Sequence, residues 1–171
     1  MPTTCFLKLE LENGEVKGSC TIAGHEDQIQ LLGWSQSFNQ PATGASESAF
    51  GGMATSCAVH QPLVISKYLD KSSGAILKAC WKADYIKKMT IMSYQASGAD
   101  SVDKSNQYLK VEAENGIITD YHISDSTEMP QEQFTVKYQK ITYTFTPLDN
   151  ETGAAGSAEP VSHDLSSGVV A

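Results

Sequence analysis

Residues 24–38 read G-H-E-D-Q-I-Q-L-L-G-W-S-Q-S-F, a polar start followed by a dense apolar run. The polar residues predict a turn, and the apolar residues predict a strand from Ile29 to Phe38. By their spacing, the apolar residues divide between two faces. These are Ile29 and Leu31 on one face, and Leu32, Trp34 and Phe38 on the other. Gly33 lies where the phase changes, which predicts a bulge or a tight bend at that point.

Alternating apolar and polar residues predict strands along much of the remaining chain. The predicted strands cover Cys5–Leu11, Val16–Ile22, Cys57–Leu69, Lys88–Gln95, Tyr108–Ile123 and Phe134–Phe145. Asn115-Gly116 leaves open whether the fifth of these strands is divided into a hairpin. In the sixth, the apolar alternation changes phase near Gln139-Lys140, and this predicts a β-bulge.

One segment has helical spacing instead. Asp70 or Ser72 can cap a helix that we predict over Ser73–Asp84. Its inward-facing residues are predicted to be Ile76, Leu77, Cys80 and Ala83. Many strands, short turns and one helix predict a mainly β fold, either a compact antiparallel β-barrel or a two-sheet sandwich. We expect one β-domain over residues 1–149, followed by a small-residue C-terminal tail or late-ordered arm over residues 150–171.

The charge of the chain excludes one class of partner. All 12 basic residues are lysines, and the net charge is −8. Nucleic-acid binding depends on positive charge and, for specific contacts, on arginine, so we expect no nucleic-acid partner. The sequence contains no apolar run long enough to cross a membrane and no visible signal peptide. We therefore expect synthesis in the cytoplasm, without a membrane partner, and export only through a dedicated machine.

The sequence contains no convincing metal or cofactor site. Its cysteines, at positions 5, 20, 57 and 80, form no C-x-x-C pair, and we expect them to be free and buried. His25-Glu26-Asp27 would point to alternating sides of a strand, so these residues are expected to form a polar turn. His60, His122 and His163 show no zinc spacing.

Catalytic motifs are incomplete. Gly33-Trp34-Ser35-Gln36-Ser37 lacks both the last glycine and the following helix of a nucleophile elbow. Ser101 and Lys104 match one element of the β-lactamase pattern, without its partners. No phosphate-binding loop is present. We expect no catalytic residues, so the chain is predicted not to be an enzyme.

Several features occur in the order found in the haemolysin-coregulated proteins (Hcp), the tube subunits of the bacterial type VI secretion machine. They are the G-H-E-D turn at 24–27, the I-Q-L-L-G-W-S strand at 29–35, a glycine-rich loop at 41–56, K-Y-L-D-K-S-S at 67–73, the L-K-A-C helix end at 77–80 and an aromatic strand before Pro147. Over about residues 3–149 the chain resembles this family, which has a phage-tail-tube-like barrel with one flanking helix.

The resemblance implies hexameric rings that stack head to tail into a tube. The subunit is itself exported and can carry small effector proteins in the lumen. Spike, sheath and baseplate proteins of the type VI machine are the other implied partners. In the family, the strand of Trp34 contributes to the inner wall, so Ser35 and Ser37 are the candidate lumen residues. An ordinary exposed strand serine remains the alternative for Ser35.

The resemblance also assigns a role to the loop at 41–56, which corresponds to a loop that reaches a neighbouring ring. Its candidate contact residues are Gly44, Phe50, Gly51, Gly52 and Met53. Two other functions stay open. A closed barrel can hold a small molecule, and a hydrolase using Ser35 or Ser101 is a third hypothesis.

Overall fold

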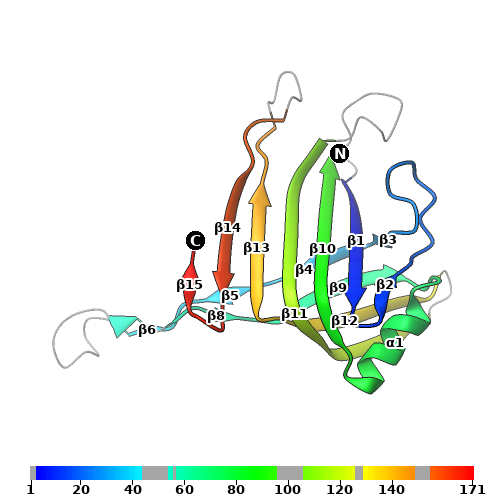
Figure 1. Cartoon of the computed structure of the whole chain (residues 1–171), viewed down its shortest axis with the longest axis horizontal. Helices are drawn as coiled ribbons and strands as arrows, with labels where there is room; N and C mark the ends of the chain where they lie inside the picture. The colour runs from blue at the N-terminus through cyan, green and yellow to red at the C-terminus, as the bar shows by residue number, and fades with distance from the viewer. Residues whose placement is uncertain (1–2, 44–53, 56, 96–105, 126–128, 149–154) are drawn as a thin grey trace.

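A computed structural model describes residues 3–43, 54–55, 57–95, 106–125, 129–148 and 155–171. Within them the fold is almost entirely antiparallel β-structure with one helix (Figure 1). The elements are β1 Thr3–Leu11, β2 Gly14–Val16, β3 Ile29–Leu31, β4 Gly33–Ser35, β5 Phe38–Asn39, β6 Ala42–Thr43, β7 Ala54–Thr55, β8 Val59–His60, β9 Leu63–Tyr68, α1 Ser73–Lys82, β10 Tyr85–Gln95, β11 Asn106–Ser124, β12 Gln131–Lys137, β13 Lys140–Phe145, β14 Glu159–Asp164 and β15 Val169–Val170.

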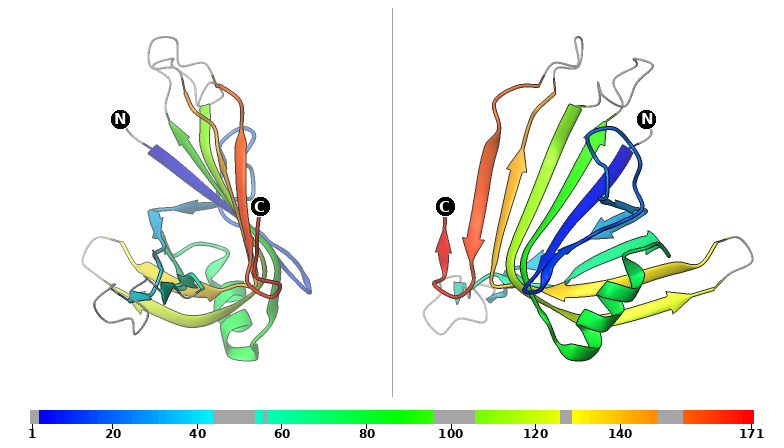
Figure 2. Two further views of the ribbon diagram at one scale, coloured as in Figure 1. Left: turned by 90° about the vertical axis from the view of Figure 1, so that its left-hand side faces the viewer. Right: turned by 45° about the vertical axis from the view of Figure 1, so that its right-hand side comes forward.

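The strands form a two-layered barrel. One layer has the order β15-β14-β13-β11-β10-β1-β2, and the other contains β11, β12, β9 and β4. Figure 2 shows the first layer upright and the second crossing beneath it. The circuit closes because β3 pairs with β1 while β4, one residue later, pairs with β9. This arrangement confirms the predicted antiparallel barrel with one flanking helix.

The core lies between the two layers. Its fully buried members are Leu7, Leu9, Ile29, Leu63, Ile65, Ile76, Ile86, Met89, Ile91, Phe134 and Val136. Ile76 is on α1, and along β9 and β12 the others alternate with more exposed residues, as expected for sheets with one buried face. Burying a side chain of this size contributes roughly 1.5–3 kcal/mol. The barrel is therefore held mainly by its apolar interior.

β11 is long enough to belong to both layers. Its first part pairs with β13 and its last part with β12, and Asn115 has a φ of 52° between them. At Gly116, an added Cβ would lie 3.0 Å from the carbonyl oxygen of Lys137. Asn115-Gly116 is therefore a corner within the continuous strand β11. It does not divide this strand into a hairpin.

The predicted strand at 134–145 crosses the same corner and becomes β12 and β13. The predicted change of phase is present, because burial alternates up to Tyr138 and resumes at Ile141. The predicted β-bulge is wrong. Ile117 lies opposite Lys137 and Glu114 lies opposite Lys140, so β11 matches this segment residue for residue. Both strands turn together from one layer to the other.

The predicted strand at 29–38 is likewise divided, with the bend at the predicted place. β3 ends at Leu31, and β4 begins at Gly33 because the chain changes its partner from β1 to β9. Trp34 packs against the core. Leu32 is 45% exposed and Phe38 49%, so neither is buried in the core beside Trp34.

The predicted helix is confirmed, although it ends earlier than expected. α1 stops at Lys82, and Ala83 adopts the left-handed conformation with a φ of 54°. Ala83 is exposed, which corrects its predicted inward position, while Ala79 is buried instead. The inner face of α1 packs on β11, so the helix depends on this contact more than on its own propensity.

The prediction of a strand over Val16–Ile22 is wrong. Only Val16 belongs to β2, and a loop follows in which Gly18 donates a hydrogen bond to the carbonyl oxygen of Asp27, at 2.7 Å. A Cβ at Gly18 would lie 2.2 Å from the carbonyl oxygen of Gln28. The backbone at Gly18 therefore lies so close to the backbone at Asp27 and Gln28 that position 18 has no room for a side chain.

The cysteines are less buried than expected, and part of the C-terminal segment pairs with the sheet. Cys5, Cys20 and Cys80 are half-buried and Cys57 is exposed, so the expectation of full burial is wrong for all four; all are free. Of the residues predicted to form a C-terminal tail, 155–171 contain β14, which pairs along β13, and β15. β13 offers a free edge, so even a weakly apolar segment can add to the sheet there.

The contact at Gly18 gives the first prediction. We expect Gly18→Ala to lower the free energy of unfolding by about 1–3 kcal/mol, because a methyl group cannot fit without moving backbone. Urea unfolding followed by tryptophan fluorescence, at matched protein concentration, measures this. Gly33→Ala is the control, since nothing lies within 4 Å of its added Cβ. An equal loss in both variants would contradict the account.

Candidate functional site

Ser35 and Ser37 lie on the outward side of the strand that closes the barrel. Ser35 is exposed on β4 and lies opposite Val64, while its neighbour Trp34 lies opposite Ile65 and points to the core. Both serines line a shallow depression of about 360 Å³. Its other lining residues are Gln36, Gln61, Pro62, Val64 and Thr135. None of these is charged, so the face offers hydroxyl and amide groups.

A chain of polar side chains runs from this face toward the C-terminal edge of the sheet. Gln36 accepts a hydrogen bond from the Tyr143 hydroxyl at 2.6 Å, and its amide donates to the Tyr138 hydroxyl. The Tyr138 hydroxyl also bonds His60 Nδ1 at 2.9 Å. On the other side of the ring, His60 Nε2 lies 2.8 Å from Nδ1 of His163. The network therefore joins β13, β8 and β14.

The electrostatics of this network favour neutral groups. Burial raises the pKa of Tyr138 to about 12, and it raises the pKa of Tyr143 further. Burial, followed by repulsion from His163, lowers the pKa of His60. A hydrogen bond between two imidazole rings needs one unprotonated nitrogen, so the pair cannot carry two protons and keep the bond. Sequence reasoning missed this network, since its members are up to 127 residues apart in the chain.

An apolar pocket of about 410 Å³ lies beside the histidine pair. It is lined by Phe38, Ala58, His60, Ile141, Tyr143, Phe145, Val161, Ser162, His163 and Val170. β5 and β8 form one wall, while β13, β14 and β15 form the other. Phe38, Phe145 and Val161 are each about half exposed. An exposed apolar surface of this kind suits contact with another molecule.

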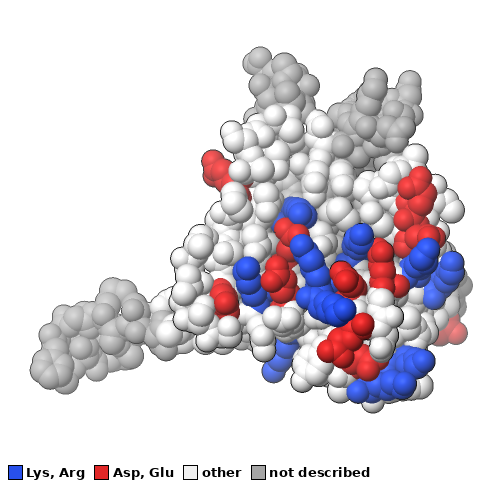
Figure 3. All heavy atoms as spheres, in the orientation of Figure 1, with Lys and Arg blue, Asp and Glu red and all other residues white. Residues whose placement is uncertain are grey.

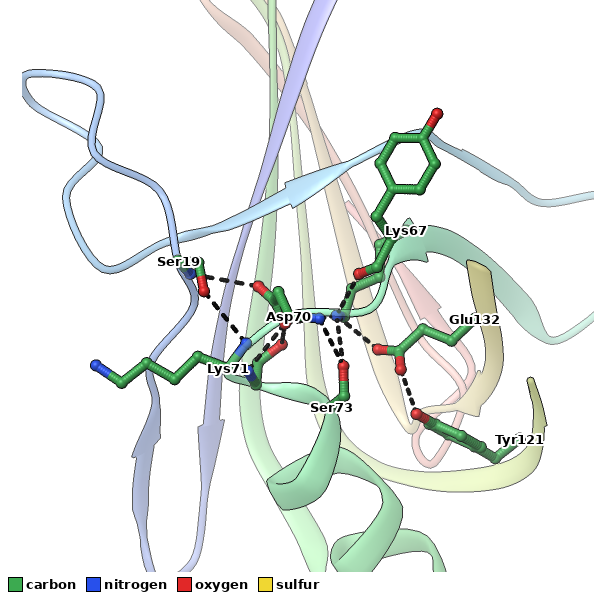
Figure 4. Close-up of polar contacts among 9 residues, drawn as sticks. Ser19, Lys67, Asp70, Lys71, Ser73, Tyr121 and Glu132 are labelled. Atoms are coloured by element: carbon green, nitrogen blue, oxygen red, sulfur yellow. Dashed lines mark hydrogen bonds and ion pairs between the residues drawn. The ribbon is translucent and has the colours of Figure 1, made fainter. Parts of the chain in front are cut away.

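A buried ionic cluster fixes the start of α1 (Figure 4). The Lys67 ammonium group is fully buried and lies 2.6 Å from Oε1 of Glu132, which is also fully buried. It donates hydrogen bonds to Asp70 Oδ1 at 2.7 Å, to the Tyr68 carbonyl at 3.0 Å and to Ser73 Oγ at 3.3 Å. Lys67 therefore joins β9, β12 and the first residue of the helix.

The remaining groups of this cluster complete the pairing. The Tyr121 hydroxyl donates to Oε2 of Glu132, and burial followed by this bond raises the pKa of Tyr121. Partial burial alone would raise the pKa of Asp70, but hydrogen bonds from Lys67 and Ser72 hold it below its ordinary value. Ser19 also bonds Asp70 and the Lys71 amide. Glu132 Oε1 has only its ion pair with Lys67 and no hydrogen bond, while the other polar groups named here are hydrogen-bonded within the cluster. Such internal pairing suits a structural role.

The predicted ring-contact loop is only partly described. Its ends form β6 and β7, a two-stranded ribbon that extends away from the barrel (Figure 1). Gly44, Phe50, Gly51, Gly52 and Met53 lie outside the described residues, as do Ser101 and Lys104. In the part of the chain that the structure describes, no histidine, lysine or carboxylate hydrogen-bonds the side chain of Ser35 or Ser37. The face therefore lacks a base that could activate either serine.

His25 is occupied by local contacts. Its ring stacks on Phe6 with centroids 4.0 Å apart, and Nδ1 bonds the Gln28 side chain at 3.0 Å. Asp27 pairs with Lys17 at 2.8 Å. Across the described ranges, no three histidine, cysteine or acidic side chains come together as metal ligands. No helix within those ranges has the length and apolar character to span a membrane.

These features define the class: a mainly β, barrel-like protein with a projecting ribbon and an exposed apolar pocket at one edge of its sheet. The comparisons identify which one. Residues 6–145 match the family "Type VI secretion system effector, Hcp". The chain belongs to this family, whose members are exported tube proteins of the type VI secretion system. The family is structural and not enzymatic.

Known proteins agree with this assignment. The chain is 30% identical over 137 residues to the "Major exported protein" of Pseudomonas aeruginosa, covering 74% of each chain. A solved type six secretion system protein superposes with a TM-score of 0.86, at 20% identity, covering 99% of this chain and 100% of the other. More distantly, a chain of the anti-feeding prophage baseplate, solved with six-fold symmetry, gives a TM-score of 0.54 at 10% identity, covering 84% and 93%. At these identities, both structures show the shared fold alone.

The buried cluster gives a second prediction. We expect Lys67→Met to lower the free energy of unfolding by about 3–5 kcal/mol, because Glu132 stays buried without its counter-charge. The double variant Lys67→Met/Glu132→Leu should recover most of that loss, since an apolar pair of similar volume is tolerated. Denaturant unfolding measures both.

Lys88→Met is the matched control, because the Lys88–Glu112 pair is partly exposed and should cost about 0–1 kcal/mol. A loss at Lys67 no larger than at Lys88 would contradict the central place of the cluster.

The histidine pair gives a third prediction. Because the pKa of folded His60 lies below its ordinary value near 6.5, the unfolded chain binds more protons as the pH falls through this range. The contribution of His60 to stability is therefore present above 6.5 and lost as the pH falls toward the lowered pKa. We expect His60→Phe to reduce the drop in unfolding free energy between about pH 7.5 and 5.5.

His122→Gln is its control, since His122 is exposed on β11 and outside the network. Unfolding free energies of the three proteins across this pH range provide the measurement. An unchanged slope in His60→Phe would show that the pair does not couple protons to folding.

Proposed function

We propose that this chain forms hexameric rings that stack head to tail into a tube, and that it is exported with that tube. Small effector proteins would travel in the lumen. The observation that carries the proposal is the family match over residues 6–145, together with a fold likeness that spans almost the whole chain. The six-fold baseplate chain of similar fold supports a ring of six.

The surfaces of the subunit are consistent with a ring. A ring needs a head-to-tail contact in which two different surfaces of one chain meet. The half-exposed pocket rim at β13, β14 and β15 is a suitable surface for one side of this contact, because its apolar side chains are unusual on a monomer. A charge of −8 on each subunit opposes uncontrolled association.

Two further assignments belong to the same proposal. Ser35 and Ser37 would face the lumen, where an uncharged hydroxyl and amide surface allows varied cargo to pass without strong binding. Gly44, Phe50, Gly51, Gly52 and Met53 would contact the neighbouring ring. The ribbon of β6 and β7 supports the second assignment, since it extends away from the barrel and these residues lie between its two strands in the sequence. Spike, sheath and baseplate proteins of the secretion machine are the proposed partners.

The apolar pocket supports a second candidate function, a small-molecule-binding barrel. Its volume of about 410 Å³ is within the range of small-molecule sites. This candidate requires a monomer whose melting temperature rises when an apolar ligand binds. The tube requires a ring even without ligand.

Light scattering after size exclusion separates the two functions and provides the fourth prediction. We expect a species of about six times the 18.4 kDa subunit. Val161→Lys, on the pocket rim, should shift this species toward monomer, because six buried lysines would lack partners. Thr142→Lys is the control on the opposite face of the same sheet. A monomer that ligands stabilise would favour the second function.

A further inference from the structure

The outward face of α1 has a composition unlike the rest of the surface. Its inner side is formed by Ile76 and Ala79, which are buried. Residues on the opposite side follow the helical spacing of one stripe. They are Lys71, just before the helix, and Gly74, Ala75, Lys78, Trp81 and Lys82, all exposed. We call this stripe the α1 face.

Trp81 is the most exposed large hydrophobic residue in the described chain, at 77%. Tyr85, just beyond the helix, is 59% exposed. Tryptophan and tyrosine contribute strongly to protein interfaces when a partner covers them. Gly74 and Ala75, almost two turns before Trp81, have little side chain to cover the backbone there. The α1 face therefore offers one aromatic anchor beside a flat surface.

The charge around Trp81 is locally positive on an acidic chain. Residues 71–87 contain four of the 12 lysines and one acidic residue, Asp84, while the whole chain has a net charge of −8. Figure 3 shows a group of lysine side chains at the lower right, over α1, with acidic side chains next to it. Within the described residues, none of Lys71, Lys78, Lys82 and Lys87 forms an ion pair.

Lysines on the neighbouring sheet behave differently. Lys88 and Lys110 both pair with Glu112, at 2.7 and 3.0 Å, and Lys8 pairs with Glu15 at 3.4 Å. Each of these three lysines therefore has a carboxylate partner, whereas the four lysines around Trp81 have none among the described residues. Lys82 also favours the C-terminal end of the helix, but this explains neither Lys71 nor the exposed Trp81.

We propose that the α1 face is a docking site for an acidic segment of a different protein. An apolar side chain of that segment covers Trp81, and its carboxylates pair with Lys78 and Lys82. This arrangement buries the largest exposed apolar side chain and gives the free lysines opposite charges. The inference is independent of whether the chain forms rings.

Two other occupants fit the observations less well. A second copy carries the same net charge of −8, and like net charges oppose the association of two copies. An anionic membrane would be repelled by the net charge of −8, and one tryptophan beside glycine and alanine is too small an apolar face for insertion. A protein segment contacts the α1 face alone, so the rest of the charge matters less.

Tryptophan fluorescence gives a direct test, because the chain has only two tryptophans. In the variant Trp34→Phe, all tryptophan emission comes from Trp81. If this variant fails to fold, the emission of Trp81 is obtained by subtracting the spectrum of Trp81→Phe from that of the natural protein. The probe is a synthetic amphipathic helix of glutamate and leucine, compared with its lysine and leucine counterpart. We expect only the acidic probe to shift Trp81 emission to the blue, with weaker binding when salt rises from about 50 to 500 mM.

The charge variant Lys78→Glu/Lys82→Glu should weaken binding by about tenfold or more. Lys137→Glu/Lys140→Glu makes the same charge change on β12 and β13 and should bind like the natural chain. Equal binding of both probes, or no effect of the α1 variant, would overturn the proposal. Absence of any binding would overturn it as well.

Two more outcomes identify the rejected occupants. Iodide should still quench Trp81 in any oligomer the chain forms; protection there would mean that a second copy covers the face. Vesicles of phosphatidylglycerol should not shift Trp81 emission, and a shift would point to a membrane. Light scattering measures the oligomer separately. A result that contradicts the ring can therefore be told apart from one that contradicts docking at the α1 face.

Discussion

The buried charge pair between Lys67 and Glu132 is the constraint on which the rest of the structure depends. It joins β9 to β12 inside the second layer, and the same ammonium group holds Asp70 and Ser73 at the start of α1. A buried ion pair contributes little net stability, but removing one partner is costly, so it penalises any other arrangement of these elements. The position of α1, and with it the outward direction of Trp81, follows from this cluster.

The second constraint is the shared corner of β11. A strand that leaves one layer and enters the other lets a small chain close a barrel without long connections, and Asn115 and Gly116 make the turn sterically possible. Closure at β11 leaves β13, β14 and β15 as an extension beyond the barrel, with an apolar pocket on its inner side. The same geometry that completes the core thus creates an exposed apolar edge, which is suited to a contact between subunits.

Much of this could be predicted from the sequence, because alternation and helical spacing report directly on burial. The barrel class, the bend at Gly33 and the helix at α1 follow from such patterns. The sequence predicts a bulge where the corner lies, because it shows a phase change but not that the partner strand turns with it. The exposure of Leu32 and the loop after Val16 also depend on which segments the chain pairs with, and local sequence does not show this. The network of His60, Tyr138 and His163, and the pairing of Lys67 with Glu132, unite residues that no local pattern links.

Cryo-electron microscopy of the assembled protein tests the central claim, that this barrel is a tube subunit. The account predicts six-fold rings, with Ser35 on the inner wall, the β14–β15 edge at a contact between subunits and α1 on an accessible surface. Particles without rotational symmetry, or a ring in which the Ser35 face is turned away from the lumen, would contradict it.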